Sequence, residues 1–268
     1  MGENKRKYHR GRRRKQKSSI ISNMILVIAI IVFCVSAFQL FRIMKGYYDG
    51  RSEYDKIRDL AIETEGKKNG EEEQARFQVN FDELLKINPD TIGWIRFDPE
   101  PSVISYPIVQ GSNNSEYLKK TFSSNENTLG AIFLNVDNSP AFTDKNSIIY
   151  GHRMKDGSMF RHLQDYEDQS FWEANPYFYI YTPDGSEMKY HIYSVGEVED
   201  TSDTYLTVFG TEEEYQAFLN MTKEVALYDT GVEVTTNDTI VTLSTCTSAS
   251  DNHRFVVRGV REEGGADE

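Results

Sequence analysis

The longest apolar stretch of the chain covers residues 20–41 and contains no charged side chain. A helix needs about 20 mostly apolar residues to cross a bilayer, so the stretch predicts a transmembrane helix within residues 19–43. Nine basic side chains and one acidic side chain precede it in residues 1–18. By the positive-inside rule, this basic tail places the N-terminus in the cytoplasm and the rest of the chain outside.

Two processing alternatives fit this stretch less well. Val35-Ser36-Ala37 has the small residues of a signal-peptidase site, but the apolar stretch exceeds the roughly 7 to 15 residues of a cleaved signal. Cys34 could carry a lipid, yet Phe33 stands where a lipoprotein site requires a small residue. The pattern therefore favours an uncleaved signal anchor.

Residues 44–76 are rich in charges of both signs and poor in apolar residues. This composition predicts a charged stalk that is partly helical at most. A globular domain is expected from about Phe77 to residue 262, followed by a flexible tail over 263–268. Near its start, Asn80 and Glu83 have the spacing of a helix-capping box.

Beyond that helix the periodicity changes to short β-rich runs separated by turn residues. Residues 183–186, Pro-Asp-Gly-Ser, predict a hairpin turn between two of the runs. Three helical segments are expected as inserts, over 115–120, 158–168 and 211–224. Because eight short strands in one domain must hide their edges, the chain is predicted to be mainly β, a closed or nearly closed eight-stranded barrel with peripheral helices. The eight predicted strands are residues 91–97, 104–110, 131–136, 147–152, 177–182, 188–199, 239–245 and 254–262.

Charge and cysteine content exclude several classes of function. The formal net charge of the chain is −12, and the 250 residues after the basic tail carry 21 basic and 41 acidic side chains. Such an acidic body repels a polyanion, so nucleic acid is not an expected partner. Two cysteines cannot form a cysteine zinc site, and the acidic residues lack EF-hand spacing. No metal and no cofactor are expected.

Cys246 is the one thiol that follows the apolar stretch, so it has no partner for an intramolecular disulfide. It stands at the end of the β run over 239–245, directly before a polar loop. A rigid strand end that faces a loop is a typical place for a catalytic group, so Cys246 is a candidate nucleophile. The alternative is a buried, inert cysteine.

A nucleophilic thiol needs a base, and His152 has the most suitable position among the histidines. It follows the strand over 147–150 and opens a loop, as Cys246 does. His9 is on the cytoplasmic side, structural roles are favoured for His162 and His191, and His253 is a minor candidate. The histidines are His9, His152, His162, His191 and His253.

Arg254 begins the strand that follows Cys246 along the chain. If the two strands are neighbours, Arg254 and Cys246 lie at the same end of the sheet. A guanidinium there could stabilise a thiolate and hydrogen-bond an oxyanion. The alternative is a plain ion pair with Asp251 or another surface acid.

These residues carry a family resemblance. Thr242-Leu243-Ser244-Thr245-Cys246 resembles the TLxTC signature of sortases, and residues 150–160 are similar to the histidine segment of class B sortases. The similarity extends over most of residues 80–262. It implies a cysteine transpeptidase on the outer face of the plasma membrane of a Gram-positive cell.

The resemblance also implies roles and partners. Cys246 would attack the carbonyl after Thr in the C-terminal sorting motif of a surface protein, an Asn-Pro-x-Thr type or another Pro-x-Thr variant. The resulting thioester would be resolved by an amine of the peptidoglycan precursor. His152 would act as general acid and base, and Arg254 would stabilise the oxyanion.

Further positions match the family's peptide groove. The segment over 201–206 with the helix over 211–224 resembles the insertion that helps class B enzymes choose their substrate. Each match could equally reflect packing. The predicted substrate-binding residues are Asn114, Leu118, Tyr150, Ser244 and Thr245.

Three alternatives stay open. Asp251 is the one acid in the loop after Cys246, so a Cys-His-Asp arrangement is possible. A pilin-polymerising sortase would carry the same catalytic residues, although no lid segment and no second C-terminal membrane helix is evident. A non-catalytic, membrane-anchored β-domain that binds peptide or cell-wall material would not need Cys246, His152 and Arg254 together.

Overall fold

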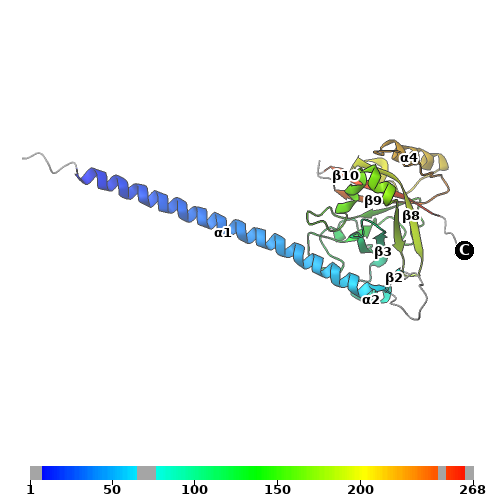
Figure 1. Ribbon diagram of the computed structural model, residues 1–268, viewed down its shortest axis with the longest axis horizontal. Helices are drawn as coiled ribbons and strands as arrows, with labels where there is room; N and C mark the ends of the chain where they lie inside the picture. Colours follow the sequence, from blue (N-terminus) through cyan, green and yellow to red (C-terminus); the bar gives the residue numbers. More distant parts are fainter. Residues whose placement is uncertain (1–7, 65–76, 247–251, 263–268) are drawn as a thin grey trace, which may run out of the picture. The chain divides into compact units, whose positions relative to one another are not determined.

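The structure, a computed structural model, describes residues 8–64, 77–246 and 252–262 (Figure 1). The chain divides into two compact units, residues 1–48 and 49–268. The first unit consists of most of helix α1, Tyr8–Ala61. From Ile20 onward, helix α1 is long enough and apolar enough to cross a membrane, judged by length and composition.

The second unit is built on a closed β-barrel, which confirms the predicted fold class. The strand order around the barrel is β10-β8-β7-β3-β4-β5-β6-β9. Closure pairs every barrel strand on both sides and leaves no free edge. The strands are β3 (Thr91–Phe97), β4 (Ser105–Val109), β5 (Ile132–Leu134), β6 (Asn146–Tyr150), β7 (Tyr177–Tyr181), β8 (Glu187–Glu199), β9 (Ile240–Cys246) and β10 (His253–Arg261).

Two neighbouring pairs, β4 with β5 and β6 with β9, are parallel, and the other barrel pairs are antiparallel. Aromatic and branched side chains fill the core, among them Trp94, Phe178 and Phe255, all nearly fully buried. Gly259 lets one of these rings approach, because a Cβ at this position would lie 2.5 Å from the Phe178 ring. The barrel is therefore a packed core that holds its strand ends rigidly.

Helical inserts lie where the sequence predicts them, with two additions. The 3-10 helices η1 (Glu116–Leu118) and η2 (Arg161–Glu167) and helix α4 (Glu212–Glu224) fall within the three predicted segments. Helix α2, Phe81–Ile87, begins at the predicted cap, because the Asn80 side chain accepts the Glu83 N–H over 3.2 Å. Helix α3 (Gln169–Ala174) and the 3-10 helix η3 (Asp203–Tyr205) were not predicted.

Helix α4 covers one side of the barrel beside β8, β9 and β10 (Figure 1). Its Phe218 and Leu219 pack in one buried cluster with Tyr193 of β8, Ile240 of β9 and Val260 of β10. The amphipathic helix thus buries its apolar face against the start of β9 and the last residues of β10, at the end of these strands opposite to Cys246 and Arg254.

The structure differs from the prediction of a stalk over residues 44–76. Helix α1 continues to Ala61, and Tyr54, Ile57 and Ala61 are at most 4% exposed. Their spacing of three and four residues places them on one helix face, which a count of charges over the segment does not reveal. Strand β1, Ile62–Thr64, then pairs with β2, Phe77–Val79. The rest of the predicted stalk, residues 65–76, and the predicted tail over 263–268 lie outside the described residues.

Candidate active site

Three neighbouring strands place the predicted catalytic residues at one end of the barrel. In the parallel pair of β6 and β9, Tyr150 lies opposite Ser244. His152 lies two residues after Tyr150, and Cys246 lies two residues after Ser244. In the antiparallel pair of β9 and β10, Cys246 lies directly opposite Arg254. The backbone register alone therefore brings together the residues that the sequence singled out; for Cys246 the structure describes the backbone.

The imidazole of His152 is held by the segment that follows β4. Its Nε2 lies 2.7 Å from the carbonyl oxygen of Leu118. Because a carbonyl oxygen only accepts hydrogen bonds, Nε2 carries the proton. In the neutral imidazole Nδ1 is then the nitrogen that can accept a proton, and in the imidazolium Leu118 still stabilises the ring.

Arg254 is oriented by two acceptors. Its Nη1 donates to the carbonyl oxygen of His253 over 2.9 Å, and its Nη2 donates to Oδ2 of Asp200 over 3.4 Å. A long, partly exposed ion pair of this kind contributes little to stability, about 0 to 1 kcal/mol, so its effect is on the direction of the guanidinium. Asp251, the partner considered from the sequence, lies outside the described residues.

Tyrosine rings line the approach to Ser244. The Ser244 hydroxyl lies 2.9 Å from the hydroxyl of Tyr205, and the Tyr205 ring stacks on Tyr150 with 6.2 Å between centroids. The Tyr150 hydroxyl accepts a hydrogen bond from the Asn135 side chain over 3.1 Å. Burial raises the pKa of both Tyr150 and Tyr205, so both phenols are neutral at ordinary pH. Ser244 is only 2% exposed.

The other predicted substrate-binding residues have different surroundings. Asn114 is half-buried, and its Oδ1 accepts the Val136 N–H over 2.8 Å. The Leu118 side chain is exposed. Thr245 is 2% exposed, and its buried Oγ1 has no hydrogen-bond partner within the described part of the chain. Substrate contact by these residues, and by Tyr150 and Ser244, stays a prediction.

The other described histidines occupy different positions in the fold. The Nδ1 of His162, in the 3-10 helix η2, lies 2.7 Å from Oδ2 of Asp165. His191 packs against the Tyr177 ring, 4.5 Å between centroids. His253 is the first residue of β10 and directly precedes Arg254, so it shares the catalytic end of the sheet with His152. Position alone leaves His253 as a second candidate, which substitution can separate from His152.

Several residues at this end of the barrel carried no signal in the sequence. Asp200 holds Arg254, and Tyr205 bonds to Ser244, although the segment over 201–206 had been noted. The Leu118 carbonyl contacts His152, and Gly130 lies so close that a Cβ on it would be 2.9 Å from the ring. Every residue has a backbone carbonyl, and the sequence does not distinguish one glycine from another. Which of them lies beside His152 is visible only in the folded structure.

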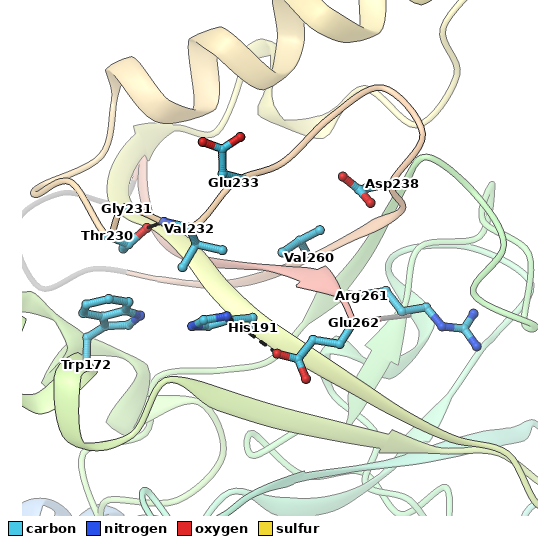
Figure 2. Close-up of a pocket in the computed structure, with 10 residues that line it drawn as sticks. All are labelled: Trp172, His191, Thr230, Gly231, Val232, Glu233, Asp238, Val260, Arg261 and Glu262. Carbon is cyan, nitrogen blue, oxygen red and sulfur yellow. Dashed lines mark hydrogen bonds and ion pairs between the residues drawn. The ribbon is translucent and has the colours of Figure 1, made fainter. Parts of the chain in front are cut away.

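A separate pocket of about 470 Å³ lies at the other end of β10 (Figure 2). Trp172 and His191 form one wall, and Glu262, 3.7 Å from His191, also pairs with Lys189 over 2.8 Å. Burial lowers the pKa of His191, and Glu262 partly opposes this effect. Arg261, which also lines the pocket, is seven residues after Arg254 along β10, so the pocket is remote from the strand ends that carry His152 and Cys246.

Comparison with known proteins gives consistent matches. Residues 99–262 match a family model described as a sortase domain. The chain is 32% identical over 238 residues to sortase B of Staphylococcus aureus, covering 88% of this chain and 92% of that protein. It is 37% identical over 182 residues to sortase B of Listeria monocytogenes, covering 66% of this chain and 72% of that protein.

Solved structures agree with these sequence matches. A crystal structure of sortase B from Bacillus anthracis superimposes with a TM-score of 0.70 at 32% identity, over 83% of this chain and 100% of that chain. A sortase B-substrate complex from Staphylococcus aureus gives a TM-score of 0.67 at 28% identity, over 81% and 97% of the two chains. The likeness therefore covers nearly the whole barrel unit of the protein.

Proposed function

Since the chain belongs to the sortase family, and within it to class B, we propose that it is a membrane-anchored transpeptidase that cleaves a Pro-x-Thr-type sorting motif after Thr. It transfers the cleaved surface protein to an amine of the peptidoglycan precursor. The observation that carries this proposal is the register of β6, β9 and β10, which brings His152, Cys246 and Arg254 to one end of the barrel.

In the first half-reaction, the Cys246 thiol passes its proton to His152, and the resulting thiolate sulfur attacks the carbonyl carbon of the motif threonine. A C–S bond forms, and the carbonyl electrons move onto oxygen to give a tetrahedral oxyanion. The C–N bond then breaks, and the leaving amine takes a proton from the His152 imidazolium. The products are a thioester on Cys246 and a free C-terminal fragment.

In the second half-reaction, the acceptor amine attacks the thioester carbon. His152 takes the proton that the amine loses, the new amide bond forms, and the thiolate leaves. One amide is broken and one is made, so the complete reaction needs no oxidant, reductant or cofactor. The Leu118 carbonyl, 2.7 Å from Nε2, supports the ring in both of its protonation states.

Arg254 stabilises the oxyanion that forms in both half-reactions. Its hydrogen bonds to Asp200 and to the His253 carbonyl set the plane of the guanidinium before substrate arrives. A donor that is already oriented toward developing charge lowers the barrier without reorganisation during the reaction. Lysine would keep the charge but lose the planar fork of donors.

The N-terminal helix supports a location at the plasma membrane. Helix α1 is long and apolar enough to span a bilayer, and the basic residues precede its apolar part. This asymmetry favours a cytoplasmic N-terminus and a catalytic unit on the outer face of a Gram-positive cell.

The test is a transpeptidation assay on the full-length chain in detergent, with quenched-fluorescent Pro-x-Thr peptides and an amine acceptor. His152→Gln and Arg254→Lys are expected to lower kcat/KM by at least about 100-fold, because each removes a transition-state interaction. His253→Gln and Arg261→Lys serve as matched controls and are expected to retain activity. Equal losses in His152→Gln and His253→Gln would contradict the assignment of the general base.

A further inference from the structure

The part of helix α1 that follows its apolar stretch packs against the barrel. Residues 49–61 belong to the same compact unit as the strands, and Tyr54, Ile57 and Ala61 are at most 4% exposed. The Tyr54 ring meets Tyr106 edge to face at 5.4 Å between centroids. This stretch of helix is therefore built into the catalytic unit.

Residues 53 and 54 fasten the loop between η1 and β5 at several points. The Tyr54 hydroxyl donates to the Gly130 carbonyl oxygen over 2.7 Å and accepts the Phe122 N–H over 3.2 Å. The Glu53 carboxylate accepts the Ser123 N–H and an Asn125 side-chain N–H, each over 3.0 Å. Tyr54 thus joins two points of the loop, eight residues apart, through one buried hydroxyl.

The far end of this loop lies close beside the imidazole of His152. Gly130 has a φ of +62°, and a Cβ built on it would lie 2.9 Å from Cδ2 of His152. The same Cβ would lie 2.7 Å from the Tyr117 carbonyl and 3.0 Å from the Leu118 carbonyl, which accepts the His152 hydrogen bond. Gly130 and the Leu118 carbonyl therefore both lie next to the His152 ring.

We propose that Tyr54 is a positioning residue for His152, and that the helix next to the membrane sets the geometry of the catalytic base through Gly130. The chain of contacts is short and specific, from the Tyr54 hydroxyl to the Gly130 carbonyl and from Gly130 to the imidazole. Without that hydroxyl the Gly130 carbonyl and the Phe122 N–H lose their buried partner. A small shift of Gly130 is then transmitted directly to the ring, because packed groups in contact move together. This inference rests on the proposed function, in which His152 exchanges the proton.

Tyr54→Phe in the full-length chain tests the proposal, because it keeps the ring and its packing and removes the hydroxyl alone. Tyr48→Phe, on the same helix and 74% exposed, is the matched control. In the transpeptidation assay Tyr54→Phe is expected to lower kcat about tenfold, since misplacement of an acid–base group acts on the chemical step. KM for the peptide should stay within about twofold, because peptide contacts are unchanged. Tyr48→Phe should change neither.

A second readout does not depend on turnover. In histidine-labelled protein, with His152 assigned by His152→Gln, the His152 ring signals and their titration midpoint are expected to move in Tyr54→Phe and not in Tyr48→Phe. Unchanged His152 signals in Tyr54→Phe would overturn the proposal, as would a kcat equal to that of the control. An inactive wild type would refute the proposed function, while the titration would still decide the role of Tyr54.

Discussion

Gly130 and the backbone of Leu118, which have no reactive side chain, lie beside the His152 ring. The sequence made Cys246, His152 and Arg254 candidates, because each stands at a strand end and has a reactive or charged side chain. The register brings them to one end of the barrel, and their catalytic roles stay predictions. Gly130 and the Leu118 carbonyl could not be predicted from sequence, since their role depends on which loop the fold lays against the imidazole.

Gly130→Ala separates backbone strain from contact with the imidazole. Gly231→Ala is its control, because Gly231 has a similar φ of +69° and open space around its Cα, whereas a Cβ at Gly130 meets His152. Both substitutions should lose stability by about 1 kcal/mol or more, since alanine is strained at positive φ. Only Gly130→Ala is expected to lower kcat, measured in the transpeptidation assay with the peptide substrate in detergent. Equal activity in the two variants would show that contact with Gly130 does not position the ring.

At the scale of elements, sequence patterns predicted those helices and strands whose formation depends on neighbouring residues in the chain. All eight strands and the cap of α2 follow from alternation, turn residues and capping spacing. The end of helix α1 was missed because its apolar face is narrow and lies within a charged segment. Its burial depends on loop residues far along the chain, such as Phe122 and Leu129, which no local pattern connects to it.

The cap of α4 provides an element-scale prediction. Thr211 Oγ1 accepts the Glu214 N–H over 3.2 Å, and the Glu214 carboxylate in turn accepts the Gly210 N–H over 2.7 Å. Thr211→Ala should lower the free energy of unfolding by about 1 kcal/mol, while Thr211→Ser, which keeps the oxygen, should cost less. Urea unfolding followed by circular dichroism measures both. If the two variants were equally destabilised, the loss would not come from the cap.

For the molecule as a whole, the barrel keeps the predicted catalytic residues apart from the pocket around His191. The predicted catalytic residues Cys246 and Arg254 stand at one end of β9 and β10, and the pocket around His191 lies at the other. Helix α4 packs on the start of β9 and the end of β10, and the end of α1 contacts the loop between η1 and β5. Changes at the His191 end should therefore affect the stability of the fold and leave the transpeptidation chemistry unchanged.

The pH dependence of stability tests this separation. Burial lowers the pKa of His191 below its ordinary value of 6.5, so the unfolded chain takes up a proton here before the folded one does. His191 therefore reduces stability as pH falls below about 6.5 toward its lowered pKa. His191→Gln should show a smaller fall in Tm between pH 7.5 and pH 5.5 than the wild type, with unchanged kcat at neutral pH. A Tm that falls equally in both proteins would remove His191 as a source of the pH dependence.

The most direct test of the central claim is the intact mass of the enzyme during turnover. In a Cys34→Ser background Cys246 is the one remaining thiol, so any thiol adduct can be assigned to it. With a Pro-x-Thr peptide, the account predicts a mass increase equal to the peptide fragment up to and including Thr less one water, sensitive to hydroxylamine and absent in Cys246→Ala. Normal cleavage of the peptide by Cys246→Ala would contradict the account, and so would turnover by the wild type without an adduct that hydroxylamine can trap.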